Sequence, residues 1–147
     1  MSEGWIIAHY VWTWGGNVAA ALVCAFAFWR GGPVEKRGAA IILAGWLLTL
    51  LVVYLHIERI HGVHYYIMAI DTAVLIGFTA LSLRSRRLWT LFMAAFQLND
   101  VMTHFAAFVP GMDTYTYVTA IGFWGGWGLI FILTWGTWDH MRRSQST

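Results

Sequence analysis

Basic residues occupy every second gap between the long apolar runs of this chain. Of the nine Lys and Arg residues, only Arg59 follows the second run. The other eight follow the first, third and fifth runs: Arg30, Lys36, Arg37, Arg84, Arg86, Arg87, Arg142 and Arg143. Because short loops on the cytoplasmic side of a membrane are enriched in Lys and Arg, this alternation predicts five crossings, with the N-terminus outside and the C-terminus inside.

The apolar runs have the length that a membrane crossing requires. About 20 residues, each rising 1.5 Å along a helix, cross roughly 30 Å of hydrocarbon. The predicted helices cover residues 5–29, 38–57, 65–83, 88–109 and 115–138. We therefore predict one all-α, five-helix transmembrane domain over residues 1–147 and no separate soluble catalytic domain. The compact loops favour a bacterial inner membrane.

The composition is typical of a membrane protein and excludes several other classes. Hydrophobic residues make up 59% of the chain and charged residues 11%. The net charge of +2 does not indicate nucleic-acid binding, because the expected cytoplasmic loops hold eight of the nine basic residues. Cys24 is the only cysteine, which excludes an internal disulfide and a CxxC motif. The expected partner is the lipid bilayer.

Four ionisable residues from three predicted helices lie at a similar depth. His9, Asp71, Asp100 and His104 fall about 6 to 13 Å below the outer boundary of the membrane, at 1.5 Å per residue. Ionisable groups inside a membrane cost several kcal/mol and usually face the bundle interior or a wet cavity. Their common depth therefore predicts a polar pocket that opens toward the periplasm.

Helical spacing adds three residues to this pocket. Gln97, Asp100 and His104 lie three and four apart, so they share one face of the fourth helix. His64 lies seven residues before Asp71 and hence on the same side, and Asn17 flanks the face of the first helix that carries His9. Because no Lys or Arg lies deep in a span, we expect Asp71 to be protonated, bound to a cation or hydrogen-bonded to a polar neighbour.

Three kinds of chemistry suit these residue types. Imidazole and carboxylate groups together ligate divalent transition metals, with His9, Asp71, Asp100 and His104 as the expected ligands. Two histidines from different helices can instead hold a b-type haem, and His9 with His104 is the best-placed pair. Asp71, Asp100 and His104 could also relay protons or cations, because His titrates near neutral pH.

The role favoured by the sequence is an accessory or scaffold component of a membrane assembly, in which the polar interior gives packing specificity. A redox protein or a metal-dependent membrane enzyme that binds a metal or haem in the pocket is the alternative. A proton- or cation-coupled transporter is a further alternative, and it would need a homo-oligomer because five short helices rarely build an alternating-access pathway alone.

Small residues indicate where helices approach closely. Gly122 and Gly126 form a GxxxG pattern in the predicted fifth helix. Such pairs allow two helix backbones to pack against each other. Packing within the chain is the simpler interpretation, and a homodimer or a partner membrane subunit docked on this glycine-rich helix is the alternative.

Overall fold

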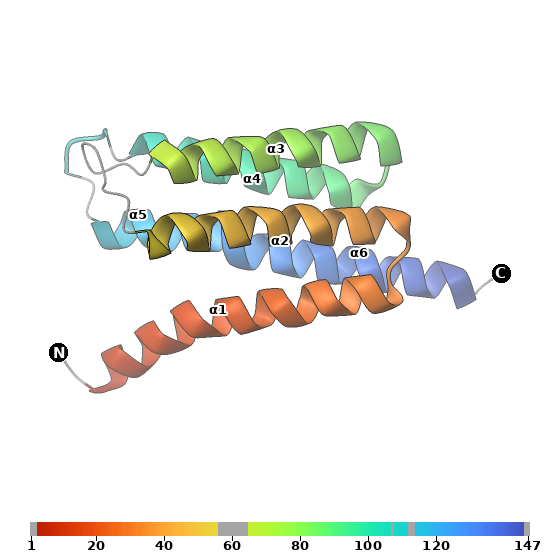
Figure 1. Ribbon diagram of the computed structural model, residues 1–147, viewed down its shortest axis with the longest axis horizontal. Helices are drawn as coiled ribbons and strands as arrows, with labels where there is room; N and C mark the ends of the chain where they lie inside the picture. The colour runs from red at the N-terminus through yellow and green to blue at the C-terminus, as the bar shows by residue number, and fades with distance from the viewer. Residues whose placement is uncertain (1–2, 56–64, 107, 112–113, 146–147) are drawn as a thin grey trace.

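The regular elements described by the computed structural model are all helical (Figure 1). It describes the backbone of residues 3–55, 65–106, 108–111 and 114–145, and their side chains from residue 14 onward apart from that of residue 114. The elements are α1 (Glu3–Arg30), α2 (Pro33–Tyr54), α3 (Tyr65–Ser85), α4 (Leu88–Ala106), α5 (Thr114–Ile121), the π-helical segment η1 (Gly122–Trp127) and α6 (Gly128–Gln145). The last three elements follow one another without a break and form one long rod.

Two helix boundaries differ by about five residues or more from those predicted by the apolar runs, and the others by three residues or fewer. The predicted start of the second helix at residue 38 is wrong, because α2 begins at Pro33. Proline suits the first turn of a helix, because N–H groups there have no acceptor within the helix and proline has no N–H. Glu35 lies in the same turn, where its negative charge interacts favourably with the helix dipole. The fifth helix was predicted to end at residue 138, but α6 continues to Gln145 with Arg142 and Arg143 in its last turn.

The helices run alternately up and down, so the eight basic residues that follow the first, third and fifth runs gather at one end of the bundle (Figure 1). We call this the basic end. Helix α2 packs between α1 and α3, α4 packs on α3 and α6, and α6 also contacts α1. Arg59 lies outside the described residues.

Apolar side chains cover the outside of the bundle, and polar ones occur inside it. Leu22, Ile76, Leu83 and Phe131 are each more than half exposed. The fully buried polar side chains of the described residues are Glu35, Thr90, Gln97, Asp100, His104 and Thr137. This arrangement is the reverse of that in a soluble protein and fits a lipid environment.

Three helices in the described part of the chain are long and apolar enough to cross a membrane: Pro33–Tyr54, Tyr65–Ser85 and the continuous rod Tyr115–Gln145. The polar stripe of α4 lowers its mean hydropathy, although that stripe is buried. The residues that α4 exposes are apolar, such as Leu91, Leu98 and Met102, with the exception of Asn99.

Glycines of the last rod bring it close to α4. A Cβ atom at Gly136 would lie 2.6 Å from Trp89 Cδ2, and one at Gly128 would lie 2.6 Å from Phe96 Cε1. Trp89 is buried with Phe78 and Leu133 in a tight apolar core toward the basic end. In the described structure these glycines therefore serve packing within the chain.

Candidate functional site

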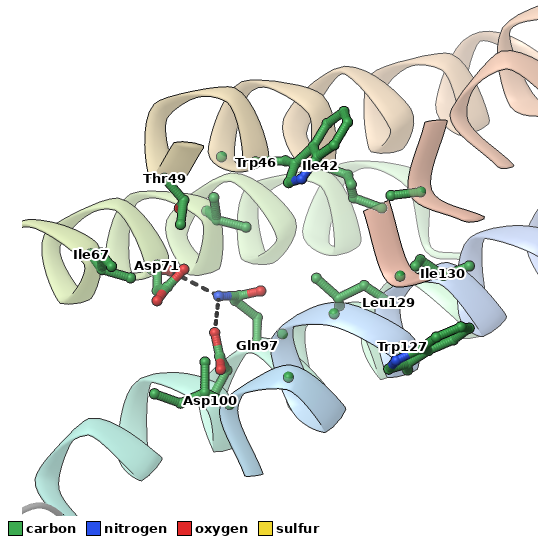
Figure 2. A pocket seen from close by; sticks show the side chains of 18 of the residues that line it. Ile42, Trp46, Thr49, Ile67, Asp71, Gln97, Asp100, Trp127, Leu129 and Ile130 are labelled. Atoms are coloured by element: carbon green, nitrogen blue, oxygen red, sulfur yellow. Dashed lines mark hydrogen bonds between the residues drawn. The ribbon is translucent and has the colours of Figure 1, made fainter. Parts of the chain in front are cut away.

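A cavity of about 350 Å³ lies between the helices, in the half of the bundle away from the basic end (Figure 2). Helices α1, α2, α3 and α4 contribute to its wall together with the α5–η1–α6 rod. Most of its lining is apolar. Its polar and aromatic lining residues include Asn17, Trp46, Asp71, Gln97, Asp100 and Trp127.

The polar side of the site comes from one face of α4. Gln97, Asp100 and His104 follow one another at intervals of three and four residues, and each side chain is only 1% exposed. This face points at α3 and at the last rod, both of which pack against α4. The predicted stripe of the fourth helix is therefore present and buried.

His104 joins three helices through its two ring nitrogens. Its Nε2 lies 2.8 Å from Asp71 Oδ2 on α3, and its Nδ1 lies 3.0 Å from the Tyr117 hydroxyl on α5. Nε2–H donates to Asp71 when that carboxyl is ionised, and a protonated Asp71 donates to Nε2. In this arrangement neither ring nitrogen is available to a metal or haem iron unless a hydrogen bond is broken.

Gln97 connects the two carboxyl-bearing residues. Its Nε2 donates to Asp100 Oδ2 at 3.0 Å and to the Asp71 backbone carbonyl at 3.3 Å. The Asp71 backbone carbonyl has no hydrogen to offer, so the amide nitrogen must face it and the amide oxygen must face the other way. In Figure 2 the Gln97 oxygen points away from Asp71, toward Leu129.

Two buried acceptors at this end of the pocket have no hydrogen-bond partner within the described residues. They are Gln97 Oε1 and Asp100 Oδ1. A buried polar atom without a partner costs about 1–3 kcal/mol, which makes such atoms rare in native proteins. Both oxygens are closed off from the cavity by the atoms packed around them, the Asp100 carboxyl by Gly125.

The π-helical segment η1 shapes the wall opposite α4. Gly122, Gly125, Gly126 and Trp127 of this segment line the cavity. A Cβ atom at Gly125 would lie 2.6 Å from Asp100 Cγ, so only glycine lets the Asp100 carboxyl approach so closely. Short π-helical turns are rare and frequently occur at functional sites.

Asn17 lies on the far wall of the cavity rather than beside Asp100. Its Oδ1 accepts a hydrogen bond of 2.8 Å from Trp46 Nε1, which fixes the indole ring of α2 against α1. Trp127 lies near Gly16, where a Cβ atom would be 3.7 Å from the Trp127 Nε1. Two aromatic rings thus border the pocket opposite its carboxyl groups.

The structure brings together four of the residues predicted for the site: Asp71, Gln97, Asp100 and His104. The side chain of His9 and all of His64 lie outside the described residues, so the proposed haem pair and the four-ligand metal set remain predictions. In the part of the chain that is described, no three His, Cys, Asp or Glu side chains form a group able to hold a metal ion.

Tyr117 was not predicted as a site residue. By sequence it is one of several aromatic residues near the outer end of the fifth helix, a position typical of the membrane interface. It is nevertheless 6% exposed and faces His104. Its position three residues after the start of α5 indicates that Tyr117 lies at the depth of the site. The sequence does not show which side of the helix faces His104.

A second buried polar group lies at the basic end. Glu35 is 0% exposed and accepts a hydrogen bond from Arg87 Nη1 through its Oε1. Its Oε2 has no hydrogen-bond partner, and His140 Nδ1 lies 3.9 Å away. This cluster links α2, the start of α4 and α6. The apolar runs of the sequence, in contrast, place Glu35 in a loop.

The chain matches no protein-family model, no curated protein and no solved structure. Its function must therefore be inferred from the residues that line the pocket.

Proposed function

We propose that the chain is a five-crossing protein of a bacterial inner membrane that binds a small, mainly apolar molecule in the pocket bordered by Asp71, Gln97 and Asp100. The observation that carries this proposal is the cavity of about 350 Å³, whose wall is mainly apolar with Asp71, Gln97 and Asp100 on one side. Ligand pockets have volumes of about 300–1,000 Å³, with apolar walls and a few polar groups that orient the ligand. The pocket has each of these properties.

An open pocket argues against a purely structural role. Unfilled space between helices forfeits the packing contacts that its walls would otherwise make. A scaffold or accessory subunit would be more stable with the space filled by apolar side chains. The mainly apolar lining is also poorly suited to hold water alone, because an ordered water needs two to four polar partners.

Filling the pocket is expected to displace the bound molecule. A Cβ atom at Gly126 would meet no atom within 4 Å, so Gly126→Leu can extend into the cavity without a clash at its base. We expect mass spectrometry of protein purified gently from native membranes to detect a co-purified small molecule, and Gly126→Leu to lower its occupancy at least tenfold.

Gly77→Ala is the matched control for this experiment. It adds a methyl group at a helical glycine outside the pocket, in ordinary contact with Ile41 at 3.4 Å. Equal occupancy in wild type, Gly77→Ala and Gly126→Leu would contradict binding in this cavity. A wild-type protein that carries no small molecule and binds none when offered would overturn the proposed function.

The proposed orientation, with the N-terminus outside and the C-terminus inside, is supported by the gathering of basic residues at one end of the bundle. We expect a green fluorescent protein fused after Thr147 to fluoresce, because this reporter folds in the cytoplasm, and alkaline phosphatase at the same position to be inactive. Active phosphatase with a dark fluorescent fusion would reverse the orientation and place the pocket toward the cytoplasm.

A further inference from the structure

We propose that a phospholipid with a negatively charged headgroup binds on the outside surface of α4 and α6, with its phosphate at Arg142 and an acyl chain along four exposed aromatic rings. These rings belong to Phe92, Phe131, Trp135 and Trp138, and we call them the aromatic strip. The proposal concerns the outside of the bundle, so it goes beyond the pocket and the molecule bound there.

The aromatic strip is a continuous exposed surface across two helices. Its exposed fractions are 42% for Phe92, 66% for Phe131, 46% for Trp135 and 52% for Trp138. On α6 the strip residues and Arg142 follow one another at intervals of four, three and four residues, so they share one side of the helix. Phe92 extends the strip onto α4, because its ring centroid lies 5.7 Å from that of Trp135.

Arg142 stands at the basic end of this strip. Its guanidinium carbon lies 5.5 Å from the centroid of the Trp138 ring, whose face attracts cations. The only carboxylate in α6 is that of Asp139, which pairs with Arg143 at 2.8 Å. No carboxylate of the described residues forms an ion pair with Arg142. A guanidinium group carries several N–H donors in one plane, an arrangement that suits the oxygens of a phosphate.

The length of the strip matches one leaflet of a bilayer. From Phe131 to Arg142 the helix rises about 16 Å, at 1.5 Å per residue. One leaflet contributes about half of the roughly 30 Å of hydrocarbon. A phospholipid whose phosphate contacts Arg142 can therefore lay an acyl chain along the strip as far as Phe131.

Charge argues against a second copy of this chain as the occupant of the strip. Two copies inserted in the same direction and packed symmetrically on this surface would bring their Arg142 side chains together. Like charges that face each other across an interface are strongly unfavourable. An anionic headgroup neutralises Arg142 instead, and its acyl chain covers the aromatic rings.

Native mass spectrometry of the full-length protein in detergent micelles tests this proposal. The protein is titrated with dioleoyl phosphatidylglycerol, which carries one negative charge, and with dioleoyl phosphatidylethanolamine, which has the same chains and no net charge. We expect phosphatidylglycerol to bind at least fivefold more tightly, because one Arg beside anionic lipid contributes roughly that factor.

Arg142→Gln is expected to reduce this preference to less than twofold, because it removes the group that contacts the phosphate. Arg84→Gln is the matched control. It removes one positive charge from another exposed side chain of the basic end, on α3 instead of the two helices that carry the strip. We expect Arg84→Gln to keep the preference within twofold of the wild-type value.

Phe131→Ala tests the acyl-chain part of the proposal. It shortens an exposed side chain of the strip without changing any charge, so we expect it to weaken both lipids alike, at least twofold. Leu83→Ala is its control, because Leu83 is an exposed apolar residue of α3. We expect Leu83→Ala to leave both affinities unchanged.

Three outcomes would overturn the proposal. The first is equal affinity of the two lipids for the wild-type protein. The second is an equal effect of Arg142→Gln and Arg84→Gln, because the preference would then come from the basic end as a whole. The third is a dimer that binds less lipid than the monomer, since a second copy would then cover the strip. The Gly126→Leu experiment tests the pocket separately.

Discussion

Arg87→Met is expected to lower the free energy of unfolding by about 3 kcal/mol, the low end of the range for a buried charge that loses its partner. Glu35 is fully buried, and its Oε1 would lose the hydrogen bond from Arg87. Its Oε2 already lacks a partner, and only His140, at 3.9 Å, lies near enough to compensate. Unfolding in mixed micelles of a mild detergent and dodecyl sulfate measures the loss.

The reciprocal change should be smaller. The Arg87 side chain is 28% exposed, so after Glu35→Gln water can solvate its guanidinium, and we expect a loss of about 1 kcal/mol. The double variant Glu35→Leu with Arg87→Met should recover most of the stability, because it leaves no unpaired charge in the interior.

Arg143→Met is the control for Arg87→Met. The Arg143 side chain is 71% exposed and pairs with Asp139 at 2.8 Å, so we expect its removal to cost less than about 0.5 kcal/mol. If Arg87→Met costs no more than Arg143→Met, the Glu35 cluster does not hold α2, α4 and α6 together.

The Glu35 cluster shows how a helix boundary hides a tertiary contact. The apolar run begins near residue 38, so hydrophobicity alone leaves Glu35 in a solvated loop. The local signal that corrects this is Pro33, which is favoured in the first turn of a helix and places Glu35 in that same turn of α2. Its pairing with Arg87, far away in sequence, could not be derived from either signal.

The sequence predicts the polar face of α4 and its depth in the membrane. It does not predict that a cavity lies beside this face. Depth along each helix and the three- and four-residue spacing together place Gln97, Asp100 and His104 in one buried stripe, and Asp71 opposite them. Which residue of the last rod meets His104 depends on the rotation of that rod. The π-helical segment η1 changes the rotation of α5 relative to α6. The residue pattern of Gly122–Trp127 does not predict such a segment.

His104→Leu is expected to lower the free energy of unfolding by about 2 kcal/mol, because it removes the hydrogen bonds to Asp71 and Tyr117 without a large change in volume. Hydrogen bonds between helices in membranes average only about 0.6 kcal/mol, so two ordinary ones would give roughly 1 kcal/mol. The larger value is expected because one partner is a carboxyl group that would be left in the interior.

Two further variants separate these contributions. Tyr117→Phe removes the bond to Nδ1 and leaves the His104–Asp71 bond in place, so we expect a loss of about 1 kcal/mol. Phe105→Leu changes an exposed neighbour of His104 on α4 and should leave stability within about 0.5 kcal/mol of wild type. If His104→Leu resembled Phe105→Leu, His104 would not link α3, α4 and α5.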